Sequence, residues 1–174
     1  LYRRDERAIS INGAEGSVLT ERPTETVSVL HTLENERPIL DQFLDDLEAD
    51  DVVLDVGANL GIFSVLGGDV AQEVVAIEPH GPTAQRCVQN LVRNDVDGSV
   101  LQLALGHVED TVSLSIENDR VGTQRPSVTK GGSDVQQVPG DDLDCEPTVV
   151  KIDVEGAEQN VLVGLGRTLQ QSVH

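Results

Sequence analysis

The chain has 174 residues, of which 38% are hydrophobic, and its formal net charge is −19. This length favours a single domain that can bury a hydrophobic core. The sequence contains no run of 18 apolar residues, so we do not expect a membrane-spanning helix. The two cysteines, Cys87 and Cys145, predict neither a disulfide framework nor a metal cluster. Because no signal peptide is visible either, we expect a cytoplasmic protein.

Acidic residues are distributed along the whole chain, and 31 Asp and Glu residues stand against 12 Lys and Arg residues. Hydrated carboxylates in every predicted element are typical of salt-adapted proteins, whose surfaces stay soluble under strong screening. An acidic surface that selects a basic partner is the alternative, and we favour salt adaptation because the acids do not gather in one segment. Acidity normally argues against nucleic-acid binding, but the global charge of a salt-adapted protein says little about one local groove. We still do not expect a nucleic-acid partner. The sequence does not indicate an oligomeric state.

The first 33 residues predict an extended amino-terminal region that packs on the following domain, residues 34–174. Asn12-Gly13 stands between short apolar segments and predicts the tight turn of a β-hairpin. Residues 26–30, Thr-Val-Ser-Val-Leu, predict a further strand because they are rich in β-branched side chains. An amphipathic helix follows, whose apolar positions recur at helical spacing: Ile39, Leu40, Phe43, Leu44 and Leu47.

A buried strand followed by a tight turn is predicted at residues 51–61, Asp-Val-Val-Leu-Asp-Val-Gly-Ala-Asn-Leu-Gly. Asp55 interrupts the apolar run, where a carboxylate is unfavourable unless a partner satisfies it. Gly57 and Gly61 allow left-handed backbone conformations and let a ligand approach the main chain. The largely apolar residues 62–66 then predict a helix on the sheet. The turn therefore lies where open α/β folds bind ligands.

A second acidic residue ends the next predicted strand, Glu73-Val-Val-Ala-Ile-Glu78. In sheets that bind nucleosides, a carboxylate at this position accepts hydrogen bonds from the ribose hydroxyls. Glu78 alone would also fit a solvated strand end, and the glycines alone would fit simple turn geometry. Because Asp55, the glycines and Glu78 occur together, we favour a ligand site.

The rest of the chain alternates predicted helices and strands, which implies a mostly parallel sheet flanked by helices. A turn through His80 and Pro82 precedes a helix that ends near Asn94 and carries Cys87 on its apolar stripe. Residues 118–134 are polar and predict a loop or a lid over the site. Three further strands and a final helix are predicted, at residues 100–105, 112–116, 148–153 and 157–169.

A second group of charged side chains surrounds the end of the last strand, in Val149-Val-Lys-Ile-Asp-Val-Glu-Gly-Ala-Glu158. Asp153 is expected at the carboxyl end of the sheet, close to the first turn, with Glu155 in the loop after it. Glu158 falls in the first turn of the predicted helix. A carboxylate there stabilises the helix dipole, and this structural role explains its position as well as a catalytic role does. Because Lys151 lies in a strand between apolar residues, we expect it to form an ion pair with a neighbouring acid. A role in orienting the substrate is the second interpretation.

The spacing of the first turn differs from the dinucleotide-binding pattern Gly-x-Gly-x-x-Gly, so a nicotinamide dehydrogenase is not favoured. The turn Asp55-x-Gly57-x-Asn59-x-Gly61 is instead similar to the first motif of class I methyltransferases, which bind S-adenosylmethionine.

Two further sequence motifs restrict the resemblance to one family within this class. They are Ala76-Ile-Glu-Pro79 and Val150-Lys-Ile-Asp-Val-Glu-Gly-Ala-Glu158. With the first turn they resemble the FkbM family of S-adenosylmethionine-dependent methyltransferases, over residues 34–166. The resemblance implies a Rossmann-like α/β fold and methyl transfer, typically to a hydroxyl oxygen of a small molecule, sugar or polyketide. The seven-stranded sheet of this class needs further strands, which we expect to be missing at the carboxyl end of this sequence.

The same resemblance implies roles for particular residues. The turn would line the methionine end of the cofactor and Glu78 would hold the ribose, whereas Asp153 and Glu155 would lie on the substrate side. No metal ligands are implied. The implied cofactor-binding residues are Asp55, Gly57, Ala58, Asn59, Gly61 and Glu78.

Methyl transfer to a hydroxyl benefits from a base that removes the proton, which contributes about 10²–10⁴-fold. Asp153 or Glu155 is the expected base or orienting group, while His80 and His107 are competitors, each more typical of a structural or solvated histidine. A mechanism in which Asp153, Glu155 and Glu158 bind a metal ion is less favoured, since these acids lack the spacing that is typical of a set of metal ligands. An RNA methyltransferase would show a basic groove or stacking aromatic residues, and neither is visible. A non-catalytic S-adenosylmethionine-binding module is the remaining alternative.

Overall fold

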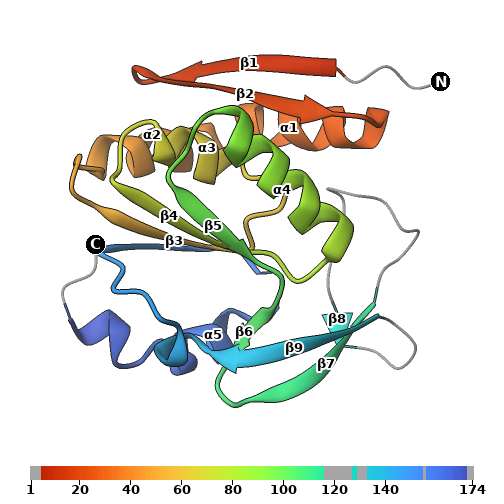
Figure 1. Ribbon diagram of the computed structural model, residues 1–174, viewed down its shortest axis with the longest axis vertical. Coiled ribbons are helices and arrows are strands. Elements are labelled where there is room, and N and C mark those ends of the chain that lie inside the picture. Colours follow the sequence, from red (N-terminus) through yellow and green to blue (C-terminus); the bar gives the residue numbers. More distant parts are fainter. Residues whose placement is uncertain (1–4, 116–126, 129–132, 155, 172–174) are drawn as a thin grey trace.

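A four-stranded parallel sheet forms the centre of the computed structural model, which describes residues 5–115, 127–128, 133–154 and 156–171 (Figure 1). Its strand order is β10-β3-β4-β5. The predicted α/β fold with a mostly parallel sheet is thereby confirmed, and the carboxyl ends of the four strands lie on the same side. The strands are β3 (Val52–Val56), β4 (Glu73–Ile77), β5 (Gly98–Leu101) and β10 (Val149–Ile152).

Helices and an amino-terminal hairpin cover one face of this sheet (Figure 1). The predicted hairpin is present, and its turn at Asn12 and Gly13 has both residues in the left-handed region, as a type I′ turn requires. The hairpin strands are β1 (Asp5–Ile11) and β2 (Ala14–Thr20). The helices are α1 (Pro23–Asn35), α2 (Arg37–Asp46), α3 (Ile62–Gly68) and α4 (Gly81–Arg93).

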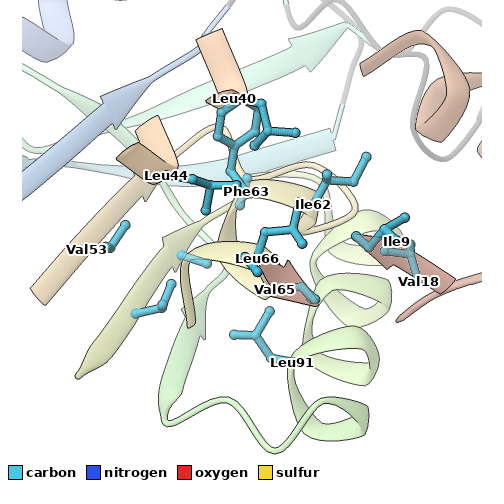
Figure 2. Close-up of a cluster of buried hydrophobic side chains, with 14 of the residues drawn as sticks. Ile9, Val18, Leu40, Leu44, Val53, Ile62, Phe63, Val65, Leu66 and Leu91 are labelled. Atoms are coloured by element: carbon cyan, nitrogen blue, oxygen red, sulfur yellow. The ribbon is translucent and has the colours of Figure 1, made fainter. Parts of the chain in front are cut away.

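Helix α3 is enclosed between the sheet and the hairpin. Residues 62–67 are all buried, and a helix that is apolar on every side needs cover on every side. The cover comes from β2, where a Cβ on Gly16 would lie only 2.5 Å from Cγ1 of Val65. Ile9 and Val18 of the hairpin join the same buried cluster (Figure 2). The amino-terminal hairpin therefore completes the core around the helix that follows the first turn.

A smaller sheet and the last helix cover the opposite face (Figure 1). The smaller sheet has the order β6-β9-β7-β8. Its strands are β6 (Ala104–Gly106), β7 (Asp110–Ser115), β8 (Ser127–Val128) and β9 (Ser133–Pro139). The last helix is α5 (Glu158–Gly164), and 3₁₀ turns lie at η1 (Gly140–Asp142) and η2 (Thr168–Gln170). The central strands alternate their side chains between the two faces, as a doubly covered sheet requires.

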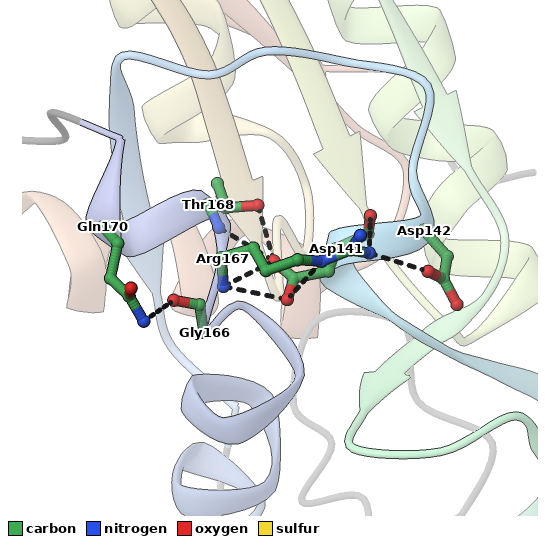
Figure 3. Close-up of polar contacts among 6 residues, drawn as sticks. All are labelled: Asp141, Asp142, Gly166, Arg167, Thr168 and Gln170. Carbon is green, nitrogen blue, oxygen red and sulfur yellow. Dashed lines mark hydrogen bonds and ion pairs between the residues drawn. The ribbon is translucent and has the colours of Figure 1, made fainter.

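The turn after α5 is anchored to η1 mainly by the carboxylate of Asp141 (Figure 3). Asp141 Oδ1 accepts hydrogen bonds from the backbone N–H and the hydroxyl of Thr168, both at 2.9 Å. Asp141 Oδ2 accepts from the backbone N–H of Arg167 at 2.9 Å. Burial raises the pKa of Asp141, but these donors outweigh burial and hold its pKa below the ordinary value.

Two predicted strands are wrong. Residues 26–30 belong to α1, because Pro23 begins a helix there and Val29 is buried while Val27 is exposed. Residues 100–105 do not form one strand. The N–H of Leu103 bonds to the carbonyl of Leu101 at 3.0 Å, and this tight turn sends β5 and β6 into different sheets.

Other predicted elements lie close to their expected positions. The helices at residues 37–46 and 81–93, and the strand at residues 149–152, match their predictions, and the final helix is shorter. Most of the predicted lid at residues 118–134 lies outside the described residues. Within the described part of the chain, no helix is long and apolar enough to cross a membrane.

Candidate functional site

A buried carboxylate lies beneath α3 at the end of β3. Asp55 is 0% exposed, and its Oδ2 accepts a 2.6 Å hydrogen bond from the hydroxyl of Ser64. Its Oδ1 lies 3.0 Å from Nζ of Lys151 in an ion pair that is not an aligned hydrogen bond. Burial lowers the pKa of Lys151, but Asp55 and Asp153 outweigh burial, so this pKa lies above its ordinary value. The predicted ion pair of Lys151 is confirmed, and it satisfies the buried acid.

The ammonium of Lys151 also contacts the turn itself. Nζ donates to the carbonyl of Gly57 at 3.3 Å and lies 4.8 Å from the centre of the Phe63 ring. A cation at this distance is attracted to the face of an aromatic ring. One side chain of β10 thus holds both Asp55 and the start of the glycine turn.

The backbone of the turn explains both glycines. Gly57 and Gly61 each have a φ of 82°, a conformation that disfavours a side chain. A Cβ on Gly57 would lie 2.0 Å from the carbonyl oxygen of Asp153, and one on Gly61 would lie 2.8 Å from Sγ of Cys87. Close packing within the chain therefore requires glycine at both positions, independently of any ligand.

Glu78 lies immediately after β4 and connects that strand to the turn. Its Oε2 accepts a hydrogen bond from the N–H of Asn59 at 3.0 Å, and its Oε1 accepts from the N–H of His80 at 2.8 Å. Burial raises the pKa of Glu78 to about 7, against the opposing effect of these two donors. The carboxyl group is therefore both a structural part of the turn and a titrating group near neutral pH.

Asp153 follows β10 and lies beside the same turn. Its side chain is 58% exposed, and its Oδ2 is 3.8 Å from Nζ of Lys151. Glu155 lies outside the described residues. Glu158 is exposed in the first turn of α5, where its Oε1 accepts from the N–H of Gly156 at 3.0 Å. Glu158 therefore lies at the start of the last helix, as predicted, and binds the backbone just before it.

The two histidines differ in their surroundings. His80 is buried at the start of α4, and its Nδ1 lies 2.6 Å from the hydroxyl of Thr83, so it is a structural residue there. His107 is exposed after β6. Among the described residues, no three His, Cys, Asp or Glu side chains gather as a metal-ligand set.

Two residues near the turn were not predicted to matter. Ser64 and Asn90 are both 0% exposed, and both bind polar groups of the turn region. For Asn90 the sequence does hold a signal, since a carboxamide stands on a helix between the buried residues Cys87 and Leu91. A buried carboxamide requires hydrogen-bond partners, but sequence alone does not identify them.

Comparison with known proteins identifies the family. Residues 55–173 match the Methyltransferase FkbM domain. The chain belongs to this family. Over 159 residues it is also 32% identical to the hexuronic acid methyltransferase AglP of Haloferax volcanii. That alignment covers 87% of the chain and 65% of the relative, so the chain spans less than two thirds of that protein. A haloarchaeal relative agrees with the salt-adapted composition.

Solved structures agree with this fold assignment. The FkbM methyltransferase of Methylobacillus flagellatus has a TM-score of 0.50 at 22% identity, over 72% of the chain and 31% of that protein. An rRNA methylase of Streptococcus thermophilus has a TM-score of 0.50 at 10% identity, over 78% of the chain and 63% of that protein. At these identities the two likenesses establish the fold alone.

Proposed function

We propose that this FkbM-family chain carries the cofactor site of an S-adenosylmethionine-dependent methyltransferase that acts on an oxygen of a hexuronic acid-containing sugar. The observation that carries the proposal is the meeting of the Asp55 turn, Glu78 and Asp153 at the carboxyl ends of three adjacent strands. Family membership supports methyl transfer, and the name of the haloarchaeal relative supports the class of acceptor.

The residues present fit this cofactor. Oδ1 of Asn59 is buried and has no hydrogen-bond partner among the described residues, so it can accept from the ammonium of the methionine end. Each oxygen of Glu78 accepts one backbone N–H and keeps capacity for a ribose hydroxyl. An open groove between the start of α4 and the end of β5, lined by Pro82, Val88 and Gln102 among others, suits a flat adenine ring.

The chemistry divides between the cofactor and the chain. When bound, S-adenosylmethionine supplies a methyl group that its sulfonium already activates. The chain's part is to orient the acceptor and, for a hydroxyl, to remove its proton. Asp153 is the exposed base proposed for that proton, and Lys151 keeps a positive charge 3.8 Å away. A hexuronic acid also offers a carboxylate oxygen, which is ionised at neutral pH and needs no base.

Two measurements test the proposal. Calorimetric titration with S-adenosylmethionine in concentrated KCl should show binding, and Glu78→Gln should weaken it. Transfer of a labelled methyl group to hexuronic acid oligosaccharides should follow, and alkaline hydrolysis of the product distinguishes a labile methyl ester from a stable ether. Absence of binding in high salt would overturn the proposal. Binding without transfer to any sugar would favour a non-catalytic binding module.

A further inference from the structure

Asn90 of α4 joins the amino-terminal hairpin to the first turn of the site. Its side chain is fully buried, and its Nδ2 donates a 2.7 Å hydrogen bond to the carbonyl of Leu60. Its Oδ1 accepts a 2.8 Å hydrogen bond from the N–H of Leu19 in β2. Both ends of one carboxamide are therefore occupied, one by the turn and the other by the hairpin.

The hairpin offers a backbone edge to α4. Strand β2 pairs with β1 along one edge, and the N–H groups of Ser17 and Leu19 face the helix from the other. Asn94, four residues after Asn90, accepts from the N–H of Ser17 at 2.7 Å and donates to its carbonyl at 2.7 Å. Residues four apart lie on one face of a helix, so the two asparagines dock the strand together. Only Asn90 of this pair also bonds the turn.

The bond to Leu60 acts next to a residue of the turn that has a left-handed conformation. The preceding residue, Asn59, has a φ of 52°, which is uncommon for a residue with a side chain. Glu78 holds the N–H of Asn59, and Asn90 holds the next carbonyl, so the turn is fixed from two sides. A strained backbone conformation persists when the surrounding structure holds it in this way.

We propose that Asn90 is a positioning residue for the cofactor turn, with its carboxamide oriented by the bond from Leu19 of the hairpin. This inference rests on the proposed function. The hairpin lies outside the matched family domain, which begins at residue 55, yet one buried side chain links it to that domain's first motif.

Matched substitutions separate this role from general stability. Asn90→Leu removes both bonds of the link, whereas Asn94→Leu, one turn further on, loosens the hairpin without touching Leu60. The dissociation constant for S-adenosylmethionine, measured by calorimetry in high salt, should rise about tenfold in Asn90→Leu and change less than about twofold in Asn94→Leu. If Asn90→Leu does not fold, the smaller Asn90→Ala also removes both bonds, adds no buried charge and should show the same weakening.

Hydrogen exchange in the cofactor-free protein gives a second readout. The N–H of Gly61 bonds to the carbonyl of Ala58 at 2.8 Å within the turn. Its exchange should accelerate in the Asn90 variants and stay at the wild-type rate in Asn94→Leu. Equal exchange and equal affinity in the two leucine variants would overturn the positioning role. Failure of the wild-type chain to bind the cofactor would instead overturn the proposed function, and exchange at Gly61 would still decide whether Asn90 orders the turn.

Discussion

Lys151 and Asp55 are direct partners in the register of β10 and β3, and their side chains form a buried ion pair at 3.0 Å. The lysine side chain is 13% exposed and the aspartate 0%, so neither charge is well solvated. The pair joins the two charged segments of the sequence, which are almost a hundred residues apart.

Removing one member of this pair should destabilise the fold strongly. Lys151→Met leaves the Asp55 carboxylate buried without its counter-ion, and loss of one partner of such a pair costs about 3–5 kcal/mol. Urea unfolding at fixed high salt measures the free energy of unfolding. The double variant Lys151→Met/Asp55→Asn removes the uncompensated charge and should recover much of the loss. A double variant no more stable than Lys151→Met would contradict this account of the pair.

A side chain at Gly57 should be far more harmful than one at Gly13. Both glycines have positive φ angles, of 82° and 92°, so alanine at either position carries about 1–3 kcal/mol of backbone strain. Only at Gly57 does the added Cβ also meet the Asp153 carbonyl, whereas nothing lies within 4 Å at Gly13. Thermal melts of the two variants measure the difference. Equal losses of stability in the two variants would contradict this expectation, because they would show that the backbone at Asp153 can move away from the added Cβ at little cost.

Glu78 should make stability depend on pH between about 4.5 and 7. Its pKa is raised from 4.5 to about 7 by burial, so the folded chain holds a proton that the unfolded chain has released in this range. The free energy of unfolding should therefore fall as pH rises from 4.5 through 7 and then level off. Cofactor affinity should change in the opposite direction, because the ionised carboxylate is the better acceptor for ribose hydroxyls. Both pH dependences should be reduced in Glu78→Gln.

Asp153→Asn should slow turnover without weakening cofactor binding, if the acceptor is a hydroxyl. Loss of a general base lowers the rate about 10²–10⁴-fold, and the calorimetric affinity for S-adenosylmethionine should stay near the wild-type value. Glu158→Gln is the control, since that acid is exposed, binds the N–H of Gly156 at the start of α5 and should leave turnover unchanged. Full turnover in Asp153→Asn would remove Asp153 as the base and favour a carboxylate acceptor.

Asp141→Asn should loosen the turn after α5. The carboxylate accepts from two backbone N–H groups and one hydroxyl, and weakening such a partly buried set of charge-assisted bonds costs about 1–3 kcal/mol. Asp142→Asn is the control because that side chain is 61% exposed and meets Arg167 at the surface. Chemical denaturation should separate the two variants, and equal stabilities would contradict a special role for Asp141.

Local patterns predict much of this fold and the outline of the site. Alternating burial, the Asn12-Gly13 turn and the acids at strand ends indicate the hairpin, three strands of the central sheet and the position of Glu78 beside the turn that follows Asp55. The β-branched composition of residues 26–30 predicts a strand wrongly, because Pro23 begins a helix that includes them.

The contacts that hold the site together join distant residues. Lys151 with Asp55 and Asn90 with Leu60 are 96 and 30 residues apart, and each depends on which faces meet after folding. The hydrophobic periodicity and the composition of a segment depend only on residues that are close in the sequence. They predict that a buried polar side chain needs a partner, but they do not identify that partner.

The pairing of Val149 with Val53 joins strands that are far apart in the sequence, so we expect it to form late in folding. Strands β3, β4 and β5 follow one another closely along the chain, whereas β10 can join β3 only after the whole small sheet has been synthesised. Closing so long a loop slows folding, and the amino-terminal part of a chain emerges first from the ribosome. We therefore expect a nascent chain to assemble three strands around an incomplete site and to acquire Lys151 and Asp153 last.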